Sequence, residues 1–178
     1  AFDANRGGKV GDMFANFPGI DMVLTPDTAF TMTLDGIVAI RRQAYATAAR
    51  EIPKMAKQRS ALGKEISSIR SRYKELTVEK AKLSAAKKDI AGVTKELTEL
   101  QAKLTKTTKA LSALAAREKE LTGARLAWNH SHPELNCLVK AGATVFAGGS
   151  DRGISLDVAT GKRAWTATID GLVVGMSV

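Results

Sequence analysis

Between residues 42 and 127, apolar residues recur at alternating intervals of three and four positions. The segment contains one Pro and neither Phe nor Trp, and most of its residues are good helix formers. A heptad pattern sustained over this length predicts a long α-helical coiled coil. The apolar members of the series are Tyr45, Ala48, Ile52, Met55, Leu62, Ile66, Ile69, Tyr73, Leu76, Leu83, Ile90, Val93, Leu97, Leu100, Leu104, Leu111, Leu114, Leu121 and Trp128, and the polar members are Arg59, Lys80, Thr107, Glu118 and Arg125.

Two geometries would bury this series of residues, here called the seam, equally well. The spacing alone therefore leaves both geometries open. One is a single helix of roughly 125 Å, at 1.5 Å per residue, that pairs with another chain. The other is an antiparallel hairpin within one chain, in which Ile69 lies opposite Leu104 and the turn falls at residues 85–89. In the hairpin, Asp89 is expected to cap the second helix.

The hairpin register makes two further predictions about particular pairs. Arg59 and Glu118 are polar members of the seam and are expected to form an ion pair across it, which would fix the register. Tyr45 and Trp128 are its first and last members and are expected to meet where the arm begins and ends. The alternative is that Trp128 packs only into the sheet, as a blade tryptophan would.

The two flanks of this segment have a different pattern, in which short runs typical of β-strands alternate with turn residues. Residues 25–40 match residues 140–157, and each copy predicts a turn, a strand, an Asp-Gly-type hairpin turn and a second strand. A further half-copy, at residues 1–9, parallels residues 155–162. The strands are expected at residues 21–24, 29–33, 37–41, 135–140, 144–147, 154–157, 163–169 and 173–178.

The motif Asp157-Val158-Ala159-Thr160-Gly161-Lys162-Arg163-Ala164-Trp165 resembles the Asp-x-x-Thr-Gly-x-x-x-Trp signature of pyrroloquinoline-quinone-like β-propeller repeats. In this signature the Asp and the Thr-Gly close a tight turn, and the Trp packs between blades. The resemblance covers about 90 residues, or about two blades. Such repeats occur in quinoprotein dehydrogenases and in non-enzymatic propellers, including the lipoprotein of the outer-membrane β-barrel assembly machinery. The resemblance therefore suggests the periplasm or the cell envelope.

The expected fold class is α+β, with a long antiparallel coiled-coil hairpin inserted between β-propeller-like blades. The resemblance implies blade segments at residues 1–41 and 128–178, and the helical arm occupies residues 42–127. A hairpin is favoured because successive blades are neighbours, so an insertion between them must leave and return at nearly one place. The chain begins with Ala1 instead of Met, which suggests a piece of a longer protein.

The charge is distributed unevenly between the arm and its flanks. Residues 42–127 hold 20 Lys and Arg against 9 Asp and Glu, whereas the other residues hold 7 against 9. The excess is either a solvated coiled-coil surface or a footprint for an anionic partner. The arm has no interleaved aromatic residues, so specific reading of nucleic-acid bases is not expected. No apolar run is long enough for a membrane span.

One cluster contains residues that bind metals in other proteins. His130 and His132 are separated by one residue, and Glu134 follows. The spacing places no third ligand beside them, so we interpret the cluster as a polar linker and assign no metal-binding residue. Cys137 is expected to be a buried, small apolar residue.

No catalytic or cofactor-binding residue is assigned. Asp35 and Asp151 precede Gly36 and Gly153 and are expected to be turn residues, not a catalytic pair. A quinoprotein enzyme needs a full propeller, a stacking platform and a calcium site, and no part of that set can be identified. The leading hypothesis is a non-catalytic interaction or scaffolding module that contacts a protein partner or another copy through the arm. The alternatives are a fragment of a quinoprotein-type oxidoreductase whose active site lies outside this chain, and an arm that binds nucleic acid or another anionic partner.

Overall fold

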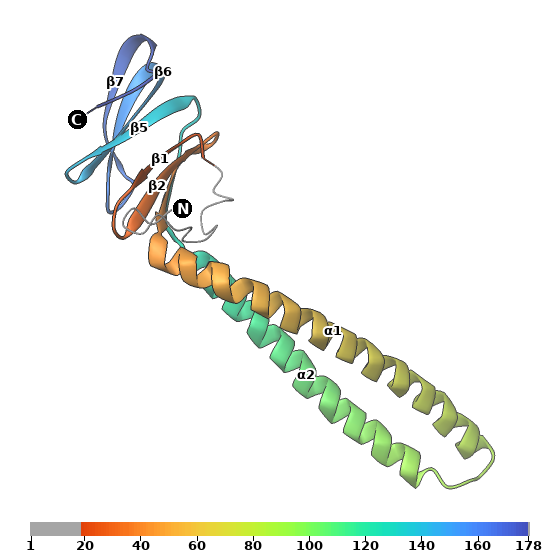
Figure 1. Ribbon diagram of the computed structural model, residues 1–178. Helices are drawn as coiled ribbons and strands as arrows, with labels where there is room; N and C mark the ends of the chain where they lie inside the picture. The colour runs from red at the N-terminus through yellow and green to blue at the C-terminus, as the bar shows by residue number, and fades with distance from the viewer. Residues whose placement is uncertain (1–18, 178) are drawn as a thin grey trace, which may run out of the picture. The chain divides into compact units, whose positions relative to one another are not determined.

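The computed structural model describes residues 19–177, and this part of the chain contains seven strands and two helices (Figure 1). Their order is β1 (Asp21–Leu24), β2 (Thr28–Thr33), β3 (Gly36–Arg41), α1 (Arg42–Ala85), α2 (Ala91–Ala124), β4 (Leu126–Ser131), β5 (Leu135–Ala141), β6 (Thr144–Asp157) and β7 (Arg163–Leu172). The predicted half-copy at residues 1–9 lies outside the described residues. Residues 173–177 form no strand, so the strand expected from residue 173 onward is wrong there.

The expected fold class, a helical hairpin between propeller-like blades, is wrong. The two helices are consecutive and lie between β3 and β4, which pair antiparallel with each other in one sheet. The β-strands form two small antiparallel sheets, and neither is closed. The error has a specific cause: the heptad count was continued to Trp128, but α2 ends at Ala124 and Trp128 lies in β4.

The first sheet has the order β1-β2-β3-β4 with antiparallel neighbours throughout. β2 and β3 form the predicted hairpin, in which Thr33 pairs with Gly36 across a turn that contains Asp35. Gly36 has a φ of 142°, and a Cβ at this position would meet the carbonyl oxygen of His130 in β4. The glycine therefore lets β4 lie close to the turn.

The second sheet has the order β5-β6-β7, and β6 folds back on itself within it. The backbone N–H of Val158 donates to the carbonyl of Ala143 at 3.0 Å, although these residues flank the two ends of β6. A straight strand of this length would hold its ends about 45 Å apart. The bend lies at Asp151, which has a φ of 57°. The first half of β6 pairs with β5 and the second half with β7, so the predicted hairpin turn at Asp151 is present.

The two sheets share one hydrophobic core. Phe30 and Ile37 from the first sheet and Val145 and Ile154 from the second are fully buried within it. A polar contact also joins the sheets, because the backbone N–H of Leu138 donates to a carboxylate oxygen of Asp21 at 2.8 Å. The buried cluster comprises Phe30, Met32, Ile37, Ala39, Trp128, Leu135, Leu138, Val145, Ala147, Ile154 and Leu156.

One strand pairing occurs twice, once in each sheet. In the first sheet Ala39 pairs with Trp128 and Ile40 with Leu126, so the register shifts by one residue at this point. In the second sheet Ser155 pairs with Trp165 and Leu156 with Arg163, with the same shift. A backbone hydrogen bond closes each pairing, from Arg41 N–H to the Arg125 carbonyl at 2.8 Å and from Asp157 N–H to the Lys162 carbonyl at 2.9 Å.

The connections between these paired strands differ greatly in length. Residues 42–125, which include both helices, connect β3 to β4, whereas only residues 158–162 connect β6 to β7. The helical segment therefore makes, between two adjacent strands of the first sheet, the connection that a short turn makes in the second sheet.

The helices α1 and α2 run antiparallel, side by side (Figure 1). The turn lies between Ala85 and Ala91, and a carboxylate oxygen of Asp89 accepts a hydrogen bond from Ala91 N–H at 2.8 Å, which confirms the predicted cap. The predicted ion pair between Arg59 and Glu118 is also confirmed, with a distance of 2.9 Å from guanidinium to carboxylate.

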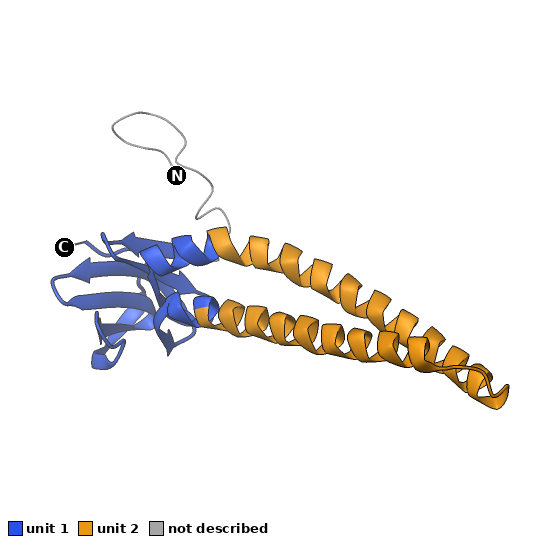
Figure 2. Ribbon diagram, turned by 90° about the horizontal axis from the view of Figure 1, so that it is seen from below, with its two compact units in different colours: residues 1–49, 121–178 blue, residues 50–120 orange. Residues whose placement is uncertain are grey.

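The described chain separates into two compact units, which Figure 2 colours differently. The β unit comprises the described residues up to Ala49 and from Leu121 onward, and the arm unit comprises Arg50–Glu120. Within residues 19–177, neither helix is long and apolar enough to cross a membrane.

Candidate functional site on the helical arm

The seam of the arm unit is formed by the apolar residues that the heptad pattern identified. Met55, Ile66, Ile69 and Leu76 of α1 are buried, and Thr107 of α2 is buried at one of the polar positions of the pattern. Because residues seven apart lie on the same side of such a helix, the seam divides the exposed surface of the arm into two faces.

One face, here called the ion-pair face, contains an apolar groove between the helices. Its lining includes Gln58 and Ala61 from α1 and Ala110 and Ala113 from α2. Every glutamate of the arm unit except Glu118 lies seven residues, or a multiple of seven, from one of these four positions, and therefore lies on this face. Glu118 pairs with Arg59. The glutamates in these rows are Glu51, Glu65, Glu75, Glu79, Glu96, Glu99 and Glu120.

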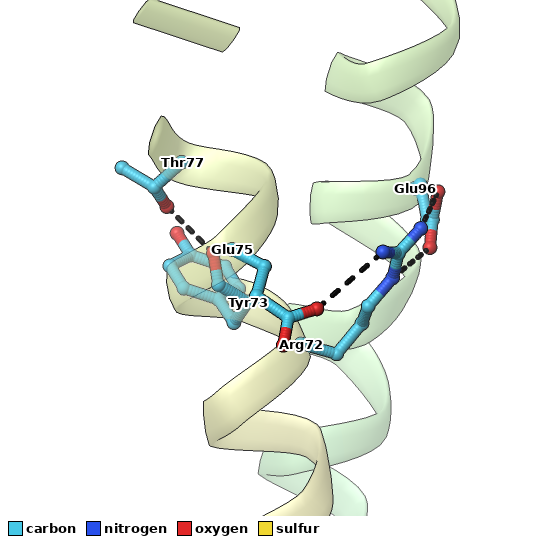
Figure 3. A network of polar contacts seen from close by, with 5 residues as sticks. All are labelled: Arg72, Tyr73, Glu75, Thr77 and Glu96. Carbon is cyan, nitrogen blue, oxygen red and sulfur yellow. Dashed lines mark hydrogen bonds and ion pairs between the residues drawn. The ribbon is translucent and has the colours of Figure 1, made fainter. Parts of the chain in front are cut away.

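Ion pairs within this face connect the two helices. Lys103 contacts Glu65 at 3.2 Å, and Arg72 contacts Glu96 at 3.0 Å and Glu75 at 3.5 Å. The hydrogen bond from Arg72 to Glu96 is the main cause that raises the pKa of Arg72. Figure 3 shows Arg72 directed toward Glu96, with Tyr73 and Thr77 on the other side of α1. These pairs are exposed to solvent, so each contributes little to stability.

The opposite face, here called the basic face, has a groove of about 500 Å³ with a mixed polar and apolar lining. The groove is lined by Tyr73, Lys80, Thr94, Leu97, Thr98, Gln101, Ala102 and Thr105. The same side of each helix continues at positions that lie seven residues, or one helical turn, farther along. These positions add five cations to the face: Arg70, Lys74, Lys95, Lys109 and Lys119. No acidic residue of the arm unit belongs to these rows.

The basic face therefore carries six cations, Arg70, Lys74, Lys80, Lys95, Lys109 and Lys119. Among the described residues none of these six takes part in an ion pair. All of them except the half-buried Lys80 are exposed. The positive excess that the sequence placed in the arm as a whole is thus concentrated on one side of it.

The sequence carried the signal for this separation, although the charge count did not use it. Counting charges over residues 42–127 treats the arm as uniform, whereas the sevenfold spacing of the glutamates already assigns them to one side. The positive excess of the arm was therefore found from the sequence, but the side of the arm on which it lies was not.

The histidine cluster lies in and after β4. The rings of His130 and His132 stack with centroids 6.3 Å apart, and Nδ1 of His132 lies 2.9 Å from the carbonyl oxygen of Pro133. Burial lowers the pKa of His130. Within residues 19–177, no three His, Cys, Asp or Glu side chains are grouped in a way that would hold a metal ion. Of the polar linker expected here, His130 and Ser131 belong to β4, whereas His132, Pro133 and Glu134 form the connection to β5.

The other candidate residues serve the backbone structure. Cys137 is buried as predicted, and this burial raises the pKa of its thiol. Asp35 lies in the β2–β3 turn and Asp151 at the bend of β6, which confirms that both are turn residues.

The Asp157–Gly161 turn has the predicted form, but Trp165, the tryptophan that follows it, is not packed as predicted. A carboxylate oxygen of Asp157 accepts hydrogen bonds from the N–H and the hydroxyl of Thr160, at 2.8 and 2.6 Å. Gly161 has a φ of 67°, and a Cβ there would lie only 2.4 Å from the ring of Trp128. Trp128 therefore packs on this turn, and its indole N–H donates to the Val158 carbonyl at 2.8 Å. Trp165, which was expected to be packed, is 51% exposed.

The aromatic residues near the ends of the helices have different neighbours. Trp128 lies beside Phe30 in the core, with ring centroids 5.8 Å apart. The guanidinium of Arg125 lies 5.8 Å from the ring centroid of Tyr45. The predicted contact between Tyr45 and Trp128 stays a prediction.

Comparisons of this chain with protein-family models, curated proteins and solved structures found no match. The resemblance to pyrroloquinoline-quinone-like repeats stays a prediction that rests on the residues of the motif at 157–165.

Proposed function

We propose that this protein is a non-catalytic interaction module whose helical arm contacts a partner macromolecule. The observation that supports the proposal is the repeated strand pairing in the two sheets. The β6–β7 pairing is closed by residues 158–162, whereas the equivalent β3–β4 pairing carries the helical segment, residues 42–125. Because a short turn can close this pairing, the arm is not needed for strand pairing, and its exposed surface is available for binding.

The composition of that surface is consistent with binding rather than catalysis. Most arm side chains outside the seam are exposed Lys, Arg, Glu, Ser, Thr and Ala. The groove on the ion-pair face is lined mainly by apolar side chains, and the groove on the basic face by a mixture of polar and apolar side chains with Lys80 as its one titratable cation. Catalytic sites more commonly combine an apolar pocket with convergent titratable groups.

The test is a chain without the arm, here called the arm-swap chain. Residues 41–125 are replaced by a second copy of residues 157–162, which make the equivalent connection. Full-length and arm-swap chains are immobilised in equal amounts and exposed to the same cell extract, and sedimentation velocity measures self-association of each. We expect bound macromolecules or self-association with the full-length chain and neither with the arm-swap chain.

Two results would overturn the proposal. Retention of the same partners by both chains would place binding in the β unit. Absence of any partner or self-association with the full-length chain would remove the interaction role of the arm.

A further inference from the structure

We propose that the basic face binds the phosphate backbone of a double-stranded nucleic acid. This inference rests on the proposed function and deepens it, because it names the class of partner. The face consists of the six cations Arg70, Lys74, Lys80, Lys95, Lys109 and Lys119 and of the groove of mixed lining beside them.

The charge on this face is available to a partner. In the described part of the chain six of the arm's eight glutamates form ion pairs with cations of the other face or of the seam, and the carboxylate of Asp89 accepts a hydrogen bond as the cap of α2. The six cations therefore have no ion-pair partner among the described residues, although Glu99 lies one helical turn from Lys95. A surface of one sign attracts an oppositely charged polymer and releases that polymer's counterions when it binds.

The spacing of the cations suits an extended polyanion. Arg70 and Lys80 are ten residues apart on α1, which is about 15 Å along the helix. Lys95 follows directly after Thr94, which lines the same groove as Lys80. From Lys95 to Lys119 the row continues along α2 for about 36 Å at 1.5 Å per residue. This length is similar to one turn of a nucleic-acid duplex.

The other side chains on the face favour phosphate over competing partners. Phosphate oxygens are contacted by Arg and Lys and also by Thr and Gln, and the groove contains Thr94 and Gln101. The face has no row of large exposed apolar residues, which an interfacial helix would insert into lipid. It also lacks the clustered aromatic anchors that are typical of protein hot spots.

The same composition favours a duplex over a single strand. Proteins that bind single strands stack bases on aromatic side chains, and Tyr73 is the aromatic residue in this groove. Thr77, Thr98 and Thr105 donate their hydroxyls to carbonyls one turn earlier, at 2.8, 3.0 and 2.9 Å, so the cations are the main donors to phosphate. Binding is therefore expected to be independent of base sequence.

The experiment measures binding of the full-length chain to a fluorescein-labelled 40-base-pair DNA duplex of mixed sequence over a series of salt concentrations. The test variant neutralises four cations of the basic face by Arg70→Gln, Lys74→Gln, Lys80→Gln and Lys95→Gln. The control variant carries Lys57→Gln, Lys64→Gln, Lys82→Gln and Lys106→Gln, which removes the same charge outside this face. Gln is a good helix former, so both variants are expected to retain their helices, and circular dichroism of each variant checks this.

We expect the test variant to bind the duplex at least ~10-fold more weakly than the control at about 100 mM salt. The slope of log K against log salt should also decrease by about 3 to 4, since each phosphate contact contributes about 0.9. The control should retain most of the affinity and slope of the unmodified chain. A second duplex of different sequence should bind equally well.

The contrary results separate this inference from the proposed function. Equal losses in the two variants would show general attraction without a defined face and would overturn the inference. Binding to poly-glutamate or to vesicles with 30% phosphatidylserine, without duplex binding, would identify another polyanion and also overturn it. Neither result would affect the arm-swap comparison, which tests whether the arm binds a partner at all.

Discussion

The β3–β4 and β6–β7 pairings show how one backbone arrangement accepts two very different connections. Both have the same register shift, a tryptophan at the same position and the same closing hydrogen bond. One is connected by residues 158–162 and the other by residues 42–125. An antiparallel helical pair returns the chain close to where it left, so the strands pair in the same way. Strand pairing in this protein therefore depends on the residues within the strands much more than on the connection.

The two pairings differ in how their tryptophans are covered. Trp128 is 7% exposed because the turn before β7 lies on its ring, whereas Trp165 is 51% exposed. The equivalent residue thus helps hold the two sheets together in one case and lies at the surface in the other. The following predictions test this difference in order of decreasing effect.

The largest difference is expected between the two tryptophans. Trp128→Ala should destabilise the β unit by about 3–5 kcal/mol, because it leaves a cavity beside Phe30 and removes the donor to the Val158 carbonyl. Trp165→Ala should cost about 1 kcal/mol or less, since half of its surface is already exposed. Urea unfolding of both variants measures the two values. Similar costs would contradict the assignment of Trp128 alone to the joint between the sheets.

The next effect concerns the turn that covers Trp128. Gly161→Ala should cost about 3 kcal/mol, because the added Cβ would clash with the Trp128 ring and Gly161 has a φ of 67°. Gly142→Ala is the matched control, since Gly142 has a φ of 54° but no heavy atom near the added Cβ. It should cost about 1 kcal/mol from backbone strain alone. Equal losses in thermal unfolding would mean that Trp128 does not depend on this turn.

A smaller effect is expected in the helical connection. The Arg59–Glu118 pair is half-exposed, so a double-mutant cycle with Arg59→Ala and Glu118→Ala should give a coupling below about 1 kcal/mol. Arg59→Leu should then raise the melting temperature of the arm, because an apolar residue replaces a charge in the seam. A clear decrease would show that the ion pair is more important for the arm than its exposure implies.

The smallest effect concerns the stability of the fold at low pH. The hydrogen bonds from Thr160 are the main cause that lowers the pKa of Asp157. A carboxyl group with a lowered folded pKa stabilises the fold above its unfolded pKa of about 3.9, and this contribution is lost as the pH falls through the folded pKa. Asp157→Asn should therefore lower stability at neutral pH and flatten the loss of stability below about pH 4. An unchanged acid limb in pH-dependent unfolding would exclude this contribution.

The parts of the fold that depend on local spacing were predictable from the sequence. The seam residues, the turn near Asp89 and the Arg59–Glu118 pair all follow from a single repeated interval. The β2–β3 hairpin follows from its Asp35-Gly36 turn, and β1 was predicted with its observed bounds. Local chemistry was sufficient in each of these cases.

The parts that depend on tertiary contacts were not predictable in the same way. Strand β4 was missed because Leu121 and Trp128 are seven residues apart and continue the heptad count, although α2 ends between them. The choice between Trp128 and Trp165 as the covered tryptophan depends on which one the Asp157–Gly161 turn reaches. The basic face was missed because a charge count over the whole arm does not distinguish one side of the helices from the other.

The most direct test of the account is the unfolding of the arm-swap chain, in which residues 157–162 are duplicated in place of residues 41–125. We predict that this chain unfolds in one cooperative transition in urea, with Trp128 buried in the native state as judged by its fluorescence. We also predict that Trp128→Ala destabilises it by about 3–5 kcal/mol, as in the full-length chain. An arm-swap chain that shows no cooperative transition would contradict the claim that the β unit folds without its helical connection.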